Sequence, residues 1–156
     1  MFKKLLNKKM LKNEKGLTLI ELLAVIVILA IVAAIAIPAI GNIIDNSRGK
    51  ALKSDVVNVM NAANIYFTDN PATAAANTVN LDGLSDGGYL ESPGGLTEAT
   101  ITYEAGGNTV SAEGVNGSVS IVVTAGTTLV QINAHDGKPI DKVVTIPNVT
   151  TPAPQP

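Results

Sequence analysis

Glu21 is the residue whose type and position most clearly require a chemical explanation. It is the only charged residue between Lys15 and Asp45, and it lies near the start of an apolar run that begins at Leu17. A carboxylate at the depth of a lipid bilayer costs about 2.5 to 3.5 kcal/mol on insertion scales. A positive charge or a hydrogen-bond donor close to Glu21 would offset that cost, so the sequence predicts an ion pair or a capped carboxylate at this position.

Residues that could carry catalysis or bind a metal are scarce in the rest of the chain. His135 is the only histidine and precedes Asp136 in a predicted turn, without a motif-placed Ser or metal ligand, which favours a solvated turn residue. Asp82 and Asp86 lie in a Gly-rich stretch, but two carboxylates without further acids at EF-hand spacing are more typical of turns than of calcium sites. The chain has no cysteine and no phosphate-binding or dinucleotide motif, so we expect no enzyme activity, no cofactor and no metal site.

The apolar run from Leu17 to Ile40 is long enough to cross a membrane. Only Thr18, Glu21 and Pro38 interrupt it. Roughly 24 residues rising ~1.5 Å each give a helix of ~36 Å, which exceeds a hydrocarbon core of ~30 Å. Six lysines precede the run, so the positive-inside tendency places the N-terminus in the cytoplasm and the body of the chain outside.

Two ordinary explanations of this run leave Glu21 unexplained. A secretory signal peptide has the same basic start, and residues 34–36 form an A-x-A-like cleavage site. The run is, however, longer than the ~7 to 15 residues of a signal h-region. A plain single-span anchor for an extracellular domain fits the length and the flanking charges. Neither explanation requires a carboxylate within the apolar segment.

The residues KGLTLIE, followed by the aliphatic run, resemble the class III signal sequence of type IV prepilins and pseudopilins. The resemblance implies that a membrane-embedded prepilin peptidase cuts after Gly16 on the cytoplasmic side and methylates the new amine of Leu17. It also implies that Glu21 acts in subunit assembly, and Pro38 falls where the family commonly has a helix-breaking proline. The chain departs from the usual pattern at Leu17, where phenylalanine is more common, and at Ala30, where many members have glycine.

Two partners for Glu21 stay open, and they can apply in succession. Thr18 and Glu21 form a T-x-x-E pattern, which is typical of a capping box at a helix start. Cleavage after Gly16 would instead create an α-amine at Leu17 that is largely protonated near neutral pH. That amine lies about one turn from Glu21 in the same chain. The resemblance implies that Glu21 meets the amine of a neighbouring subunit and so sets the register of a filament.

The helix is predicted to continue beyond Pro38, with a kink or local opening there because proline lacks an N–H and crowds the carbonyl of Ala34. A helix end at the membrane surface is the alternative. Apolar periodicity resumes in residues 41–68, which predicts an amphipathic half that lies on its own domain. The residues expected near its apolar face are Ile40, Ile44, Ser47, Ala51, Val56, Val59, Ala63 and Phe67.

The remaining chain predicts a small β domain. Residues 69–99 read as a connecting loop with one short helical turn, residues 100–146 as an antiparallel sheet, and the Pro/Thr-rich residues 147–156 as a flexible tail. The expected strands lie in ATITYEA, TVSAE, SVSIVVTA and TTLVQINA, separated by Gly- or Asn-containing turns, with KVVTI at an edge. The predicted fold class is α+β: a long N-terminal α-helix, membrane-spanning in its first half and amphipathic in its second, packed on a small antiparallel β-sheet.

The function expected from the resemblance is that of a pilin, the structural subunit of a type IV pilus filament. The implied organisation is a leader peptide of residues 1–16, a transmembrane and filament-core helix of residues 17–40, and an extracellular domain. A pseudopilin of a type II secretion or competence DNA-uptake system is the closest alternative. A membrane-anchored extracellular binding domain that does not polymerise is the second.

The partners implied are further copies of the chain in a helical homopolymer, a prepilin peptidase, an assembly ATPase and a platform protein. Membrane lipid surrounds the helix before assembly. Six of the eleven basic residues and one of the thirteen acidic residues precede Leu17, so cleavage would leave five basic and twelve acidic residues, a net charge of −7. Nucleic acid is therefore not expected as a partner, because its binding relies on Lys and Arg. The expected location is the cytoplasmic membrane for the precursor and a cell-surface filament after assembly.

Overall fold

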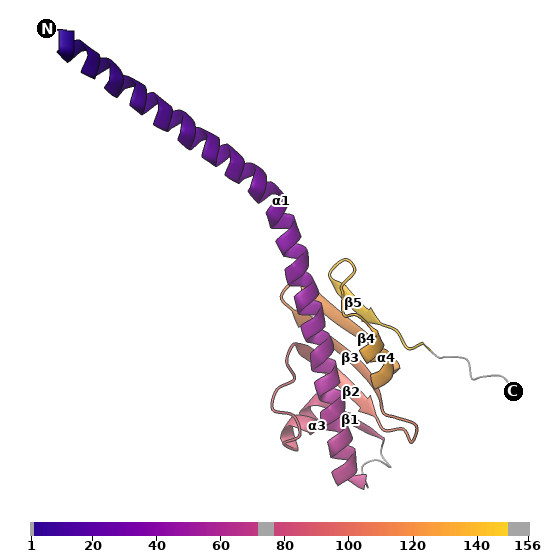
Figure 1. Ribbon diagram of the computed structural model, residues 1–156. Coiled ribbons are helices and arrows are strands. Elements are labelled where there is room, and N and C mark those ends of the chain that lie inside the picture. The colour runs from indigo at the N-terminus through magenta and orange to yellow at the C-terminus, as the bar shows by residue number, and fades with distance from the viewer. Residues whose placement is uncertain (1, 72–76, 150–156) are drawn as a thin grey trace. The chain divides into compact units, whose positions relative to one another are not determined.

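The computed structural model describes the backbone of residues 2–71 and 77–149, and the side chains of residues 18–71 and 77–149. The chain consists of two compact units, Met1–Asn42 and Ile43–Pro156. One helix, α1 (Phe2–Asp69), contributes to both units (Figure 1).

In the second unit, α1 lies on one face of a five-stranded sheet (Figure 1). The strands are β1 (Thr78–Asn80), β2 (Leu96–Thr102), β3 (Thr109–Asn116), β4 (Val119–Thr128) and β5 (Val143–Ile146), and they lie side by side in this order. Two short helices, α3 (Leu81–Asp86) and α4 (Leu129–Ala134), follow β1 and β4. The prediction of an α+β fold with a long N-terminal helix on a small sheet is confirmed.

The sheet is mixed, so the expectation of a wholly antiparallel sheet is wrong for its last strand. β1 to β4 pair antiparallel, whereas β5 runs parallel to β4, with Val144 opposite Ile121. A parallel pair needs a crossover connection, and α4 with residues 135–142 provides it. The edge position predicted for the KVVTI segment is confirmed.

The segment predicted as a connecting loop, residues 69–99, contains part of the sheet. β1 pairs with the end of β2, with Val79 opposite Ile101. α3 follows directly, and its N-cap Asn80 accepts a backbone hydrogen bond through its side chain at 2.9 Å. β2 already begins at Leu96, so the sheet starts earlier than the predicted residue 100.

The segment TTLVQINA, predicted as a strand, divides between the end of β4 and α4. The side chain of Gln131 accepts a hydrogen bond from the N–H of Thr128 at 2.8 Å, and the Thr128 hydroxyl accepts one from the N–H of Gln131. This capping box starts a helix where the β-branched residues favoured a strand. Gly126, expected in a turn between strands, lies inside β4 near an irregularity of its pairing with β3, with a φ of +85°.

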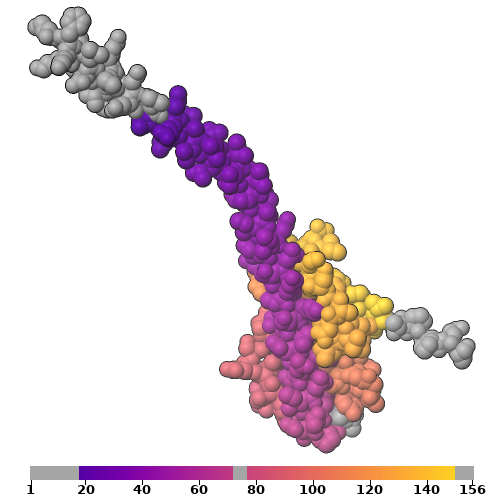
Figure 2. Space-filling view, in the orientation of Figure 1, coloured from indigo at the N-terminus to yellow at the C-terminus, as the bar shows by residue number. Residues whose placement is uncertain are grey.

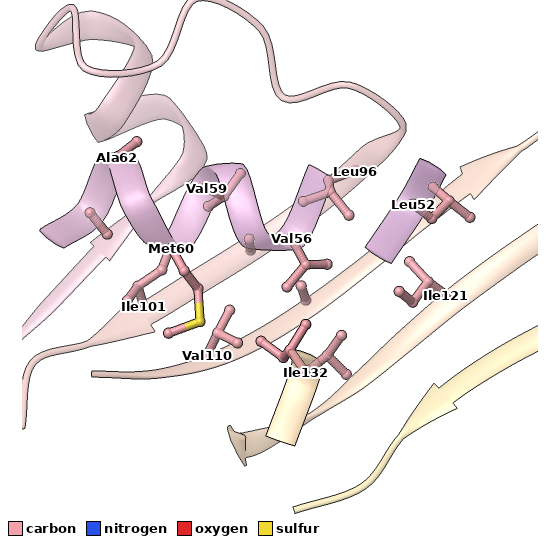
Figure 3. Close-up of a cluster of buried hydrophobic side chains, with 14 of the residues drawn as sticks. Leu52, Val56, Val59, Met60, Ala62, Leu96, Ile101, Val110, Ile121 and Ile132 are labelled. Atoms are coloured by element: carbon pink, nitrogen blue, oxygen red, sulfur yellow. The ribbon is translucent and has the colours of Figure 1, made fainter. Parts of the chain in front are cut away.

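The core of the second unit lies between α1 and the sheet (Figure 3). The helix contributes a buried face that contacts the central strands and α4. Its largest fully buried side chains are Leu52, Val56, Val59 and Met60, and they face Ile101, Val110, Ile121 and Ile132. Buried and exposed positions alternate along β4, where Val119, Ile121 and Val123 are buried, as expected of a sheet covered on one face.

The buried face of α1 differs from the predicted one over its first three turns. Val56, Val59, Ala63 and Phe67 are buried as predicted, whereas Ile40, Ile44, Ser47 and Ala51 are exposed. Gly49 and Leu52 are buried instead. A Cβ on Gly49 would lie 2.9 Å from Val144 Cγ2, so the helix backbone itself packs on β5 at this point.

The first residues of the predicted flexible tail are bound to the domain. Gln131 Nε2 donates a hydrogen bond to the carbonyl of Val149 at 2.6 Å, and Asn148 Nδ2 donates one to the carbonyl of Ala125 at 3.4 Å. The rest of the predicted tail, residues 150–156, lies outside the described residues.

Candidate functional site

The predicted cleavage site, Gly16–Leu17, lies within the helical backbone of α1. The side chains of residues up to 17 are outside those that the structure describes. In the uncut chain the nitrogen of Leu17 is a peptide nitrogen and carries no charge. The amine expected to pair with Glu21 is therefore absent until residues 1–16 are removed.

Glu21 projects from the exposed surface of α1. The ion pairs found between described side chains join other residues, Arg48 with Asp45 and Lys138 with Asp136. The carboxylate of Glu21 thus lies in an apolar stretch without an opposite charge from the described part of the chain. A positive charge that offsets the cost of the Glu21 carboxylate has to come from outside the described side chains.

The capping-box interpretation of Thr18 and Glu21 is wrong for the uncut chain. An N-cap residue has a non-helical backbone at the start of its helix. α1 begins at Phe2, so Thr18 lies in the interior of the helix. Only removal of residues 1–16 would bring Thr18 close to a helix start.

The helix surface from Thr18 to Asn42 is largely apolar and exposed. Figure 2 shows this segment of α1 in space-filling form. Its large aliphatic side chains, from Leu19 to Ile40, are 49 to 72% exposed. Among the described residues, α1 is the one helix long and apolar enough to cross a membrane, and none of that apolar stretch is buried. Soluble monomers rarely expose apolar patches of this size. The surface requires lipid or other apolar helices as its surroundings.

α1 continues as a helix through Pro38, so the alternative of a helix end at this residue is wrong. Proline donates no backbone hydrogen bond, which leaves the carbonyl of Ala34 without its usual donor four residues ahead. The predicted kink at Pro38 stays a prediction.

In the second unit, polar contacts fix α1 to the domain, and no sequence motif signals them. Asp55 Oδ2 accepts a hydrogen bond from the backbone N–H of Gly95 at 2.9 Å. Lys53 Nζ donates to the carbonyls of Asn133 at 3.1 Å and His135 at 2.6 Å. A cation at these carbonyls is favourable because they close the C-terminal end of α4.

A further contact binds the turn between β3 and β4 to α1. Asp45 Oδ1 accepts a hydrogen bond from the Ser118 hydroxyl at 3.0 Å, and Arg48 Nη1 donates to Ser118 Oγ at 3.0 Å. Arg48 also pairs with Asp45 at 3.5 Å. Gly117 has a φ of +62°, and a Cβ there would lie 2.8 Å from the Arg48 guanidinium carbon. The helix and this turn therefore fit closely at the start of the second unit.

The remaining candidate residues are placed as parts of turns and short helices. His135 Nδ1 accepts a hydrogen bond from the N–H of Gly137 at 3.0 Å. The N–H of Lys138 donates to Asp136 Oδ1 at 2.9 Å, and this bond, with the nearby Lys138 ammonium, lowers the pKa of Asp136 below its usual range. Asp82 and Asp86 belong to α3. Within residues 18–71 and 77–149, no group of three or more His, Asp or Glu side chains is placed to hold a metal ion.

Comparison with known protein families identifies the N-terminal segment. Residues 11–37 match the family model described as the Prokaryotic N-terminal methylation motif, which is the class III signal peptide of type IV pilin-like proteins. The predicted class III signal sequence is confirmed. No curated protein and no solved structure matches the chain.

The motif and the exposed apolar helix together support a pilin-like or pseudopilin-like precursor, and they fit an anchor in a membrane. The motif marks structural proteins of the pilin type, which are not enzymes. It also implies processing by a prepilin peptidase and handling by a pilin assembly machinery.

Proposed function

We propose that this chain is a pilin, the structural subunit of a type IV pilus filament. The precursor is cut after Gly16, methylated on the amine of Leu17, and polymerised through the helix of residues 17–40. The observation that supports this most directly is a membrane-length apolar surface, uncovered by the described chain, that carries one carboxylate, Glu21. Lipid alone would satisfy the apolar surface but not the carboxylate.

Cleavage supplies the charge that Glu21 needs. The new α-amine of Leu17 is largely protonated near neutral pH. In a helix it lies about one turn from Glu21 of its own chain, and in a bundle of parallel helices it can meet Glu21 of a neighbour instead. The Coulomb attraction between unit charges is strong in a medium of low dielectric constant. A contact between subunits would fix their axial register, because a shifted helix would leave both charges unpaired among apolar side chains.

Assembly then moves the helix between two apolar surroundings. In the membrane the side chains between Leu19 and Ile40 contact lipid tails, and in a filament core they would contact the same segment of other copies. The net change in apolar burial is small, so packing, the Glu21 pair and an external motor direct the transfer. An assembly ATPase and a platform protein are the components that we expect to supply this work.

Replacement of Glu21 by glutamine tests the proposal. Glu21→Gln keeps the size of the side chain and removes its charge, so the precursor should insert and be cut. The association constant between subunits should fall at least about tenfold, the equivalent of ~1.4 kcal/mol, and the yield of filaments should fall with it. Glu91→Gln, at an exposed position before β2, is the matched control and should assemble normally. Normal filaments from Glu21→Gln would refute polymerisation through this carboxylate and favour a membrane-anchored domain that does not polymerise.

A further inference from the structure

The face of the sheet that points away from α1 carries two carboxylates directly opposite each other. Glu98 on β2 pairs in register with Glu113 on β3, and both are exposed, whereas the next pair, Ala99 and Ala112, is buried toward α1. Opposite side chains in such a pair have Cβ atoms about 4.5 to 5.5 Å apart, and like charges there destabilise a sheet. Among the described side chains, neither carboxylate has an ion pair or a hydrogen bond. The isolated chain therefore retains this repulsion.

Exposed valines lie beside this pair of carboxylates. Val115 on β3 and Val143 on β5 flank Ser120 of β4, and Val122 is directly opposite Glu113. The three valines are 36 to 53% exposed. We define the outer face as the surface formed by Glu98, Glu113, Val115, Ser120, Val122 and Val143. It combines apolar contact area with negative charge, so a complementary surface presents lysines next to apolar groups.

A surface of that kind lies beside α1 in the same unit. A groove of about 370 Å³ is lined by helix residues that include Lys50, Lys53, Ser54 and Val57. Lys50 is exposed and has no carboxylate partner among the described side chains, and Lys53 is bound to the carbonyls at the end of α4. Asp136 also lines the groove, but it pairs with Lys138 at 3.4 Å. We call this surface the lysine groove, and Lys50 is its cation available to a partner.

The outer face and the lysine groove lie on opposite sides of the second unit. α1 covers one face of the sheet, and the hydrophobic core separates it from the other face (Figure 1). All Lys and Arg residues beyond residue 17 lie within residues 48–53 and 138–142, whereas residues 54–137, which include β1 to β4, have none. Lys142 precedes β5, which lies two strands away from Glu113. A cation that pairs with Glu98 and Glu113 therefore has to come from another molecule.

We propose that the outer face of one copy docks on the lysine groove of a second copy, with Lys50 between Glu98 and Glu113. One ammonium group that contacts both carboxylates offsets their repulsion. The valines of the outer face then lie against Val57 and the apolar stems of the lysines. The partner is a second copy because the chain itself carries both surfaces, with complementary charges.

This contact repeats from copy to copy. It is heterologous, because it joins two different surfaces, so each pair of copies keeps one free groove and one free outer face. Further copies can therefore add in the same way, as growth of a filament requires. The inference rests on the proposed function, to which it adds a contact between the second units of neighbouring subunits.

Site-specific cross-linking on whole cells tests the contact. The chain has no cysteine, so the full-length variant Ser54→Cys/Ser120→Cys places one thiol in the groove and one on the outer face while all charges stay in place. A short bismaleimide is the cross-linker, because it does not require the Cα separation below ~7 Å that a disulfide needs. The reference is Ser54→Cys/Ser85→Cys, since Ser85 is exposed on α3 and outside the outer face. Each single-cysteine variant controls for contacts between identical surfaces.

We expect a ladder of dimers, trimers and larger species from the Ser54/Ser120 pair, with a yield about threefold or more above that of the reference pair. Lys50→Glu or Glu113→Lys in this background should each reduce the yield to the reference level. Both reversals in one chain exchange the charges across the contact and should restore most of the ladder. Glu113→Lys should also raise the unfolding midpoint, because it faces Glu98 with an opposite charge, so loss of the ladder would not reflect misfolding.

A yield equal to that of the reference pair, or no restoration by the double reversal, would overturn the proposal. Dimers from Ser120→Cys alone, without a ladder from the pair, would overturn it and show that two outer faces meet. A ladder abolished by EDTA would also overturn it and assign the two carboxylates to a divalent cation. The sheared fraction of the same cells separates this inference from the proposed function: filaments without the ladder would refute only the contact, whereas the ladder without filaments would support the contact and count against a pilin.

Discussion

The carboxylate of Asp55, on the amphipathic half of α1, accepts a hydrogen bond from the backbone N–H of Gly95, 40 residues further along the chain, at 2.9 Å. Gly94, next to it, has a φ of +64°, and any side chain there would collide with the same carboxylate. The start of β2 is therefore shaped around one helical residue. The contact joins the helix to the start of β2 beside the side chain of Leu52, which packs against Gly95.

Asp55→Ala should destabilise the domain, because it leaves a half-buried N–H without its charged acceptor. Hydrogen bonds to charged groups contribute about 1.5 to 3 kcal/mol, and partial exposure of Asp55 places the expected loss near the lower end, about 1 to 2 kcal/mol. Urea unfolding of the detergent-solubilised chain, followed by circular dichroism, measures it. Asp69→Ala, at an exposed position at the end of the same helix, is the control and should change stability by only a few tenths of a kcal/mol. Equal effects of the two variants would contradict the role of the Gly95 contact.

Gly49→Ala should weaken the packing of α1 on β5. A Cβ at this position would meet the carbonyl oxygen of Gly137 and Val144 Cγ2, and these neighbours are backbone and core. Overpacking of this kind costs typically 1 to 3 kcal/mol, more than the ~0.5 to 1 kcal/mol that alanine gains over glycine within a helix. The same unfolding experiment should therefore show a net loss of stability.

Gly41→Ala is the matched control for that substitution, because nothing lies within 4 Å of a Cβ placed there. It should leave the unfolding midpoint unchanged or slightly raised. A Gly49→Ala variant as stable as Gly41→Ala would show that the helix can move away from β5 without loss.

Thr128→Ala should weaken the start of α4. The threonine hydroxyl accepts a hydrogen bond from the N–H of Gln131 as one half of a capping box, and loss of such an N-cap costs typically ~1 kcal/mol. Amide exchange of residues 129–134 should accelerate about fivefold if opening is local, the equivalent of that free energy. Thr124→Ala, at an exposed position on β4, should leave the exchange of α4 unchanged. Unchanged exchange in Thr128→Ala would mean that packing of Ile132 alone holds α4.

The turn at Asp136 should respond to acid. The N–H of Lys138, and then the Lys138 ammonium, hold the pKa of the Asp136 carboxyl below its usual range in the folded chain. A lowered pKa means that the carboxylate stabilises the turn above the usual aspartate range and that this contribution is lost as the pH falls through the lowered folded value. The amide proton resonance of Lys138 should follow this titration in NMR spectra.

Asp136→Asn should abolish the pH dependence of that resonance while keeping a hydrogen bond to the side-chain oxygen. A midpoint at or above the usual range of aspartate would contradict the effect of the Lys138 N–H.

The contrast between the predicted and observed elements has physical causes. The long helix and its buried positions from Val56 to Phe67 were predictable, because apolar periodicity records one-sided burial over several turns. The direction of β5 was not, because an edge strand carries the same residue pattern whether it pairs parallel or antiparallel. β1 is only three residues long, too short for an alternation to be visible.

At two other places the sequence contains a helix-capping pattern, and the prediction was wrong because the neighbouring chain determined where the helix starts. The T-x-x-Q pattern at Thr128 is a capping box, whereas the neighbouring Val130 and Ile132 suggested a strand. At Thr18 the similar T-x-x-E pattern predicted a helix start that the uncut chain does not have. In both places the surrounding chain decided the outcome: α4 has a strand before its cap, and Thr18 has helix on both sides.

The candidate site could be predicted only in part for a different reason. The motif around Gly16 and Glu21 is local in sequence, so its residues and spacing identify it without any tertiary information. The polar contacts of Asp45, Lys53 and Asp55 join positions 40 to 82 residues apart. No local pattern specifies such pairs, because the sheet brings their partners to α1 only after the domain folds.

Mass spectrometry of the N-terminal peptide, from protein sheared off the cell surface, tests the central claim most directly. We predict a mature chain that begins at Leu17 and carries one additional methyl group on its amine. That result would show that cleavage creates the charge expected to pair with Glu21. A chain that begins at Ile37, or an uncut chain that begins at Met1, would contradict the prepilin route and reduce the protein to a secreted or simply anchored domain.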